Sequence, residues 1–355
     1  MTSLLFRRLA GPLLALNLLA CSNGSSDPKP TPPPTPPVVS TTFVNPLLAS
    51  GPDPWVYEKD GFYYYTNTTG GNVTLRKTAK MSALGSAPST VVWRAPATGN
   101  YSQDVWAPEL HFLDGKWYIY FTAGPGNVGQ QRSWVLENAN ADPTTRTWTE
   151  KGRIFSLSED FWAIDMSVFE QNDSRYALWS GHENNGTNEQ RLYISKMENP
   201  WTLTGPRVEL SRPQYGWERS GPVAVNEGPE IIKHGAKTNL VYSASHCETD
   251  DYALGLLTCA TTADPMLPES WTKSATPIFV TTPASRAFGP GHNGFFQSKD
   301  GTQDWLIYHA NLRAGQRCGD ARNPRMQPFT WNADDTPNFG APVATGLALP
   351  KPSGE

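Results

Sequence analysis

Three carboxylic acids stand near the start of short apolar segments that lie far apart in the chain: Asp53, Asp165 and Glu227. Two carboxyl groups, one protonated and one ionised, can split a glycosidic bond, because one protonates the leaving oxygen while the other acts on the opposite face. In the inverting version they lie about 6.5–9.5 Å apart with a water between. A third carboxylate nearby would keep the acid protonated by like-charge repulsion. Any one of them could be a turn residue, but three in matching positions favour a shared site.

The segments that carry these acids belong to a set of five short strands with a polar residue near the start. Each is followed by an aromatic-rich strand that comes after a turn signal, and these aromatic strands recur about every 60 residues. The first strands are Pro52–Val56, Trp106–Phe112, Ala163–Phe169, Glu227–Ile232 and Gly291–Phe296. The aromatic strands are Gly61–Thr66, Lys116–Phe121, Arg175–Ser180, Thr238–Ser243 and Asp304–His309.

This repeat predicts an all-β fold, a five-bladed β-propeller with little helix, because no segment shows a sustained helical period. The first strand of each propeller blade lines a central channel. Five such strands would therefore bring polar residues from distant parts of the chain to one axis.

The amino-acid composition indicates which classes of molecule this protein is expected to bind. Aromatic residues make up 11% of the chain and charged residues only 17%, which suits many short strands and a surface that stacks on sugar rings. The formal net charge is −4 and no basic stripe is present, so nucleic acid is not an expected partner.

The beginning of the chain predicts export. Residues 1–20 have a basic region followed by an apolar run, as in a secretory signal, and Leu18-Leu19-Ala20-Cys21 is similar to a lipobox, after which Cys21 would carry lipid. An ordinary cleaved signal with a chance cysteine is the alternative. Residues 21–42 are rich in Pro and Ser and predict an extended tether, which leaves 43–355 for the catalytic propeller. Membrane contact is expected only through the lipid anchor.

Three further cysteines, Cys247, Cys259 and Cys318, lie in the predicted propeller. One disulfide is plausible in an exported protein and would leave one cysteine over, but the sequence does not choose the pair.

The segments around Asp53, Asp165 and Glu227 resemble glycoside hydrolase family 43, and the resemblance runs from Asn45 to Gly346. It implies a five-bladed propeller and hydrolysis with inversion, for which no cofactor is required. It also implies that Asp53 is the general base, Asp165 tunes the pKa of the acid and orients it, and Glu227 is the general acid. Glu230 is the competitor for the acid, but the family motif places the acid before Gly-Pro.

The same resemblance implies residues that bind substrate. Trp106 and Glu109 match a second-blade signature near the substrate, and Trp55 and Trp162 are candidate walls for the sugar, although either could be core. Arg322 matches an arginine beside the catalytic acids, with Arg325 as its competitor.

His292 matches a fifth-blade histidine that in many relatives faces a structural cation, often Ca²⁺, in the channel. Calcium prefers oxygen ligands, so a hydrogen-bonded histidine without metal is an equal alternative.

Finer features resemble the exo-α-1,5-L-arabinofuranosidase branch, among them Trp179-Ser180-Gly181 and the segment from Cys318 to Arg322. The expected substrates are plant cell-wall polysaccharides such as arabinan or arabinoxylan. The chain also ends without the C-terminal β-sandwich of many xylosidases. β-Xylosidase and endo-arabinanase activity remain alternatives within the family, and a non-catalytic sugar-binding propeller remains one outside it.

Overall fold

A computed structural model describes residues 40–156 and 159–355. The predicted signal, Cys21 and all but the last residues of the predicted tether lie outside the described residues. Residues 40–355 form one compact unit. In the part of the chain that is described, no helix combines the length and apolar character needed to span a membrane.

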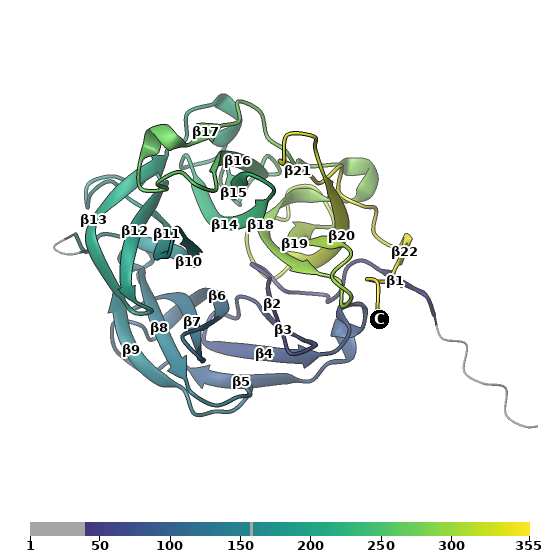
Figure 1. The fold of residues 1–355 in the computed structure, drawn as a ribbon, viewed down its shortest axis with the longest axis horizontal. Helices are drawn as coiled ribbons and strands as arrows, with labels where there is room; N and C mark the ends of the chain where they lie inside the picture. The colour runs from purple at the N-terminus through teal and green to yellow at the C-terminus, as the bar shows by residue number, and fades with distance from the viewer. Residues whose placement is uncertain (1–39, 157–158) are drawn as a thin grey trace, which may run out of the picture. The chain divides into compact units, whose positions relative to one another are not determined.

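The described unit is a ring of five four-stranded antiparallel sheets, each formed by consecutive strands (Figure 1). This confirms the predicted five-bladed β-propeller. Blade 1 contains β2 (Trp55–Lys59), β3 (Phe62–Thr66), β4 (Asn72–Thr78) and β5 (Ser89–Arg94). Blade 2 contains β6 (Gln103–Leu113), β7 (Lys116–Gly124), β8 (Arg132–Asn138) and β9 (Thr149–Ile154). Blade 3 contains β10 (Ala163–Gln171), β11 (Ser174–Gly181), β12 (Arg191–Asn199) and β13 (Thr202–Ser211).

The last two blades follow the same order of strands. Blade 4 contains β14 (Asn226–His234), β15 (Lys237–Ala244), β16 (Ala253–Ala260) and β17 (Thr272–Lys273). Blade 5 contains β18 (Phe288–Gln297), β19 (Asp304–Asn311), β20 (Asn323–Trp331) and β21 (Pro337–Asn338). Five 3₁₀ turns complete the described elements: Met81–Ser86, Val128–Gln130, Gly216–Glu218, Pro268–Ser270 and Pro283–Ser285.

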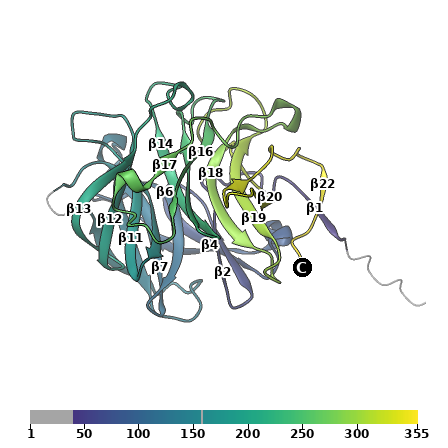
Figure 2. The same ribbon diagram turned by 45° about the horizontal axis from the view of Figure 1, so that its top comes forward.

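The first strands of the blades, β2, β6, β10, β14 and β18, surround the central axis (Figure 1), and Figure 2 shows the same ring from a second angle. Residues of all five strands line one cavity, so the expectation that these strands line a central channel is correct.

The aromatic second strands explain the packing between blades. Side chains alternate between the two faces of a strand, so in β3 Tyr63 and Tyr65 pack against blade 5 while Tyr64 packs against blade 2. The five buried apolar clusters each join two neighbouring blades in this way. The aromatic repeat seen in the sequence thus supplies the core, which lies between the blades.

A small separate sheet ties together the two ends of the described unit. Strand β1 (Thr42–Val44) pairs antiparallel with β22 (Ala348–Pro350) beside blade 5. The buried Asn45 side chain extends this link, since its Nδ2 donates to the Met326 carbonyl at 2.8 Å and its Oδ1 accepts from the Met326 amide at 3.0 Å.

Cys247 and Cys318 form a disulfide, and Cys259 is free and buried. The structure therefore identifies the disulfide pair, which the sequence does not determine.

Candidate active site

Each inner strand has a residue with left-handed backbone geometry at or just before its start, a conformation that side chains other than Gly, Asn, Asp and His seldom adopt. These five residues are Asp53, Ala107, Asp165, Gly228 and His292, with φ values of 55°, 41°, 55°, 54° and 51°. Strands β6 and β18 have a second such residue, Asp104 and Gly289. In four blades a bulge in the strand pairing contains one of the five residues, at Trp106–Glu109, Ile164–Ser167, Glu227–Glu230 and Gly291–Gly294. Bulges redirect side chains, so the ring presents five equivalent positions around one centre.

Asp53 is buried among partners that favour its ionised form. Its Oδ1 lies 2.8 Å from Arg322 Nη1, and its Oδ2 accepts from Thr68 Oγ1 at 2.6 Å. The Asp53 amide donates to His309 Nδ1 at 3.0 Å, which fixes the residue's orientation. Burial acts to raise the pKa of Asp53, but Arg322, His292 and His309 outweigh it and hold the pKa well below the usual range.

Glu227 lies one residue before the left-handed position of blade 4, and its side chain is partly exposed. Its Oε1 accepts a hydrogen bond from Tyr252 Oη at 2.8 Å. Desolvation raises the pKa of Glu227 to about 7, against the lowering effect of the Tyr252 hydrogen bond. A carboxyl group in this state is protonated below neutral pH and can donate a proton.

Asp165 connects blade 3 to the strand that carries Glu227. Its Oδ2 accepts from the Gly228 amide at 3.0 Å, and its own amide donates to Thr122 Oγ1 at 3.2 Å. Burial, followed by the nearby carboxylates of Glu227 and Asp53, raises the pKa of Asp165 well above its usual value. The three predicted carboxylates therefore interact electrostatically in one site, and Asp165 binds the backbone next to Glu227.

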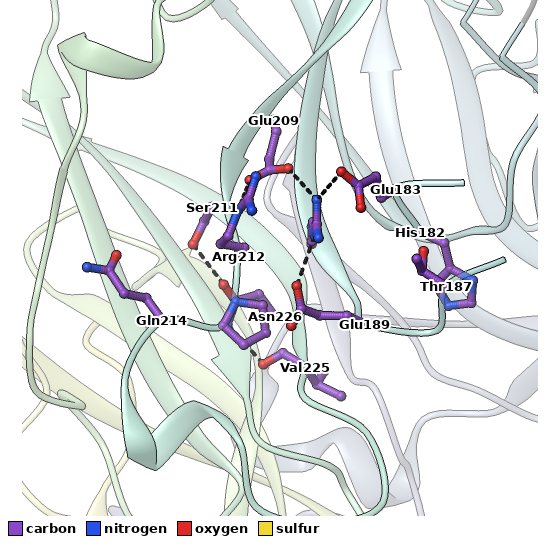
Figure 3. A network of polar contacts seen from close by, with 12 residues as sticks. His182, Glu183, Thr187, Glu189, Glu209, Ser211, Arg212, Gln214, Val225 and Asn226 are labelled. Atoms are coloured by element: carbon purple, nitrogen blue, oxygen red, sulfur yellow. Dashed lines mark hydrogen bonds and ion pairs between the residues drawn. The ribbon is translucent and has the colours of Figure 1, made fainter. Parts of the chain in front are cut away.

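The start of β14 is anchored by buried polar contacts. Asn226, the residue before Glu227, accepts from Ser211 Oγ at 2.7 Å and donates to Glu218 Oε1 at 2.9 Å. Glu218 is fully buried and pairs with Lys273 at 2.6 Å. Figure 3 shows the Ser211–Asn226 contact next to the side chains of Glu183, Glu189 and Glu209. These three carboxylates pair with the Arg191 guanidinium, each at 3.0 Å. This network restricts movement of the backbone that presents Glu227.

A second polar layer lies further along the inner strands. Glu109 and Glu230 are both buried, with His111 Nε2 2.9 Å from Glu109 and Ser167 Oγ donating to Glu230 at 3.1 Å. Burial and the adjacent Glu109 raise the pKa of Glu230 well above its usual value. A cavity of about 270 Å³ at this depth is lined in part by His111, Ser167 and Glu230 and does not include the three carboxylates.

The tryptophans predicted to bind substrate differ in burial and in surroundings. Trp106 precedes the left-handed Ala107, just as Glu227 precedes Gly228, and it is partly exposed. Trp55 lines the 270 Å³ cavity and donates from Nε1 to the Leu110 carbonyl. Trp162 is buried, donates to the Val128 carbonyl at 2.7 Å and stacks on His182 at 4.2 Å. Contacts of Trp55, Trp106, Glu109 and Trp162 with substrate stay predictions.

Of the two candidate arginines, Arg322 is the one beside Asp53. Arg325 is fully buried in blade 5, where it donates to Asn323 Oδ1 and to the Arg286 and Asn311 carbonyls.

His292 is buried, with Nδ1 3.4 Å from Asp53 Oδ1 and its ring stacked on His309 at 5.9 Å. Calcium takes about 6–8 oxygen ligands. Within the described residues no group of three or more His, Cys, Asp or Glu ligands includes His292. The metal role of His292 remains a prediction.

Three contacts of the carboxylates come from residues that sequence reasoning missed: Thr68, Tyr252 and His309. His309 is the last residue of the predicted aromatic strand Asp304–His309, which pairs with the inner strand of blade 5. That pairing could have indicated that His309 lies near the centre of the ring. Thr68 and Tyr252 lie in loops without a local motif.

Comparison with known proteins gives three principal matches. A family model described as "Glycosyl hydrolases family 43" matches residues 43–337. An extracellular exo-α-(1→5)-L-arabinofuranosidase of Streptomyces avermitilis is 43% identical over 316 residues, 87% of this chain and 65% of that protein. A protein of the same name from Streptomyces chartreusis is 41% identical over 272 residues, 76% of this chain and 82% of that protein.

Among solved structures, an α-L-arabinofuranosidase from Lactobacillus brevis superposes with a TM-score of 0.80 and 38% identity, covering 86% of this chain and 98% of that one. The chain thus spans 98% of that relative, but only 65% of the length of the Streptomyces avermitilis protein. Because the family model covers most of the propeller, the chain belongs to glycosyl hydrolases family 43.

Proposed function

We propose that this protein is an inverting exo-α-1,5-L-arabinofuranosidase that releases L-arabinofuranose from arabinan or arabino-oligosaccharides. The observation that carries the proposal is the contrast between the surroundings of two carboxyl groups in one site. Arg322 favours ionised Asp53, while the surroundings of Glu227 raise its pKa to about 7.

In the proposed reaction Asp53 accepts a proton from a water molecule, whose oxygen attacks the anomeric carbon. The bond to the leaving oxygen breaks as Glu227 donates its proton to that oxygen. Attack from the face opposite the leaving group inverts the anomeric centre. Asp165, bonded to the Gly228 amide, orients the acid.

The choice of arabinose rests on the names of the relatives. Three matching proteins at 38–43% identity are called arabinofuranosidases, two of them exo-acting on α-1,5 linkages. Two of them are called extracellular, which supports export of this chain. We extend the proposal to a lipid anchor at Cys21, which labelling with radioactive palmitate, with Cys21→Ala as the control, would test.

Product analysis separates the candidate activities. The protein is incubated with debranched arabinan, arabinoxylan and xylo-oligosaccharides, and early products are identified by chromatography. Free arabinose from linear arabinan at the first time points supports the proposal. A ladder of arabino-oligosaccharides would indicate an endo-arabinanase, and free xylose a β-xylosidase. No product from any substrate would favour a sugar-binding propeller, and retention of configuration in the first-formed sugar would contradict the inverting mechanism.

A further inference from the structure

The Cys247–Cys318 disulfide joins two loops next to the candidate active site. Cys247 lies between β15 and β16 of blade 4, and Cys318 lies between β19 and β20 of blade 5. A second contact ties the same loops, because both carboxylate oxygens of Asp250 accept from the Gly315 amide at 3.0 Å.

Each of these loops also carries a residue that contacts one of the proposed catalytic carboxylates. Tyr252, five residues after Cys247, donates to Glu227 at 2.8 Å. Arg322, four residues after Cys318, pairs with Asp53 at 2.8 Å. The disulfide thus links the partner of the proposed acid to the partner of the proposed base.

The short segments between each cysteine and its functional neighbour are held by turns. In the blade 4 loop the Thr249 amide donates to the His246 carbonyl at 2.9 Å. In the blade 5 loop both the amide and the Nε of Arg322 donate to the Gly319 carbonyl, at 3.3 and 3.2 Å. A displacement of either cysteine is therefore passed to Tyr252 or Arg322.

Glu227 belongs to blade 4 and Asp53 precedes β2 of blade 1, so blade 5 lies between their strands. The loop of blade 5 reaches Asp53, and the loop of blade 4 reaches Glu227. Strand pairing within a blade does not fix the position of one loop relative to the other.

We propose that the Cys247–Cys318 disulfide is a positioning element of the active site, which holds Tyr252 against Glu227 and Arg322 against Asp53. The inference rests on the proposed function, in which Glu227 and Asp53 are acid and base. Cys247 and Cys318 act through these partners and do not touch the substrate.

The direction of the effect follows from the two contacts. Tyr252 donates to the Glu227 carboxylate and so lowers its pKa, and Arg322 lowers the pKa of Asp53. Loosening both contacts would raise both pKa values. We therefore expect both limbs of the pH profile of kcat/KM to move to higher pH when the disulfide is opened.

The first test opens the disulfide in the folded enzyme. Both cysteines are partly exposed, so a small thiol can reach them, whereas Cys259 is buried. Wild-type protein is reduced and alkylated below its Tm, and the double variant Cys247→Ser/Cys318→Ser is examined in parallel. A small displacement of a catalytic group costs up to about a hundredfold in rate, so we expect kcat to fall roughly tenfold to a hundredfold, with the shifted pH profile.

A merely structural disulfide gives a different result. A lower Tm with unchanged kcat and unchanged pH profile would overturn the proposal. Cys259→Ala is the matched control, since it removes a cysteine outside both loops, and its kcat and pH profile should equal those of the wild type.

A double-mutant cycle checks the route through Tyr252. Opening the disulfide should cost less in a Tyr252→Phe background than in the wild type, because the contact to Glu227 is already gone. Equal costs in both backgrounds would contradict this route.

A readout without turnover separates this inference from the proposed function. Titration of the Glu227 carboxyl by ¹³C NMR, before and after reduction, should show its pKa rising when the disulfide opens. An unchanged pKa would overturn the inference even if the enzyme releases arabinose. A raised pKa would support it even if no substrate is hydrolysed.

Discussion

At the scale of single residues, Asp53 and Glu227 show how neighbours decide the protonation of chemically similar groups. Asp53 has a guanidinium, two imidazoles and a hydroxyl around it. The Glu227 carboxyl accepts a hydrogen bond from Tyr252, and desolvation disfavours the ionised form of Glu227. The separation of the two pKa values assigns the base and the acid of the proposed reaction.

Replacing Glu227 with Gln removes the proposed proton donor and keeps the shape of the side chain. We expect kcat on arabinan oligosaccharides to fall by about 10²–10⁴, the usual contribution of general acid catalysis. An aryl arabinofuranoside with an acidic phenol leaving group should lose much less, because that leaving group needs no proton. Glu230→Gln, in the deeper polar layer, is the matched control, and a larger loss in Glu230→Gln than in Glu227→Gln would refute the assignment.

The pH dependence of kcat/KM follows from the same two groups. Glu227 must be protonated, so activity should fall as pH rises through about 7. Asp53 must be ionised, and since its pKa lies well below the usual range, activity should persist into mildly acidic solution. Initial rates on a short arabino-oligosaccharide from pH 3 to 9 would measure both limbs. An alkaline limb below about pH 5, the ordinary range of a glutamate, would contradict the assigned acid.

At the scale of elements, the left-handed position near the start of each inner strand places the chemistry, and in four blades it lies in a bulge. Gly228 has φ +54°, and a Cβ there would lie 3.3 Å from the His292 ring. Its amide also donates to Asp165. The backbone at this bulge therefore has a steric and a hydrogen-bonding role.

We expect Gly228→Ala to lower both stability and activity. The left-handed conformation costs an L-residue about 1–2 kcal/mol, and displacement of His292 and of the Gly228 amide should reduce kcat. Gly61→Ala is the matched control, because Gly61 has φ +74° and nothing within 4 Å of the added carbon. Urea unfolding should show a similar loss in both variants, whereas kcat should fall only in Gly228→Ala. A normal kcat in Gly228→Ala would show that the bulge tolerates the displacement.

The elements were the most predictable part of the molecule. Aromatic-rich runs after a turn signal identify strands such as β3 and β19, and the number of these runs gives the number of blades. The bulges were not predictable, because one extra residue in a short strand leaves no periodic signal. Tyr252 could not be identified either, since its contact with Glu227 depends on how a loop crosses the face of a blade.

At the scale of the whole molecule, closure of the ring depends on contacts between blades 5 and 1 and on the segment before blade 1. The apolar cluster of Tyr63, Phe296 and Trp305 joins the two blades. Asn45 adds two hydrogen bonds to the Met326 backbone in blade 5. Asparagine in an irregular segment gives no sequence signal for such a role.

Asn45→Ala should destabilise the fold without altering the site. A buried backbone group without a partner costs about 1–3 kcal/mol, and two such groups arise at Met326, so we expect the free energy of unfolding, measured with urea, to fall by about 2–6 kcal/mol. Asn338→Ala, which removes one bond on an exposed turn, should change stability by less than about 0.5 kcal/mol. At a temperature where both variants are folded, kcat should match the wild type. An unaltered unfolding midpoint in Asn45→Ala would mean that water replaces both bonds.

The left-handed position repeated in every blade also restricts which amino acids can occupy the centre of the ring during evolution. The residues that tolerate this backbone best are Gly, Asn, Asp and His. Apart from Gly these carry a carboxyl, an amide or an imidazole, so the conformation itself enriches the centre in groups that exchange protons or form hydrogen bonds. Asp53, Asp165, Gly228 and His292 follow this restriction, and Ala107 is the exception. A propeller with this left-handed position in each blade therefore restricts the residues at its centre to a few types, most of which can exchange protons or form hydrogen bonds.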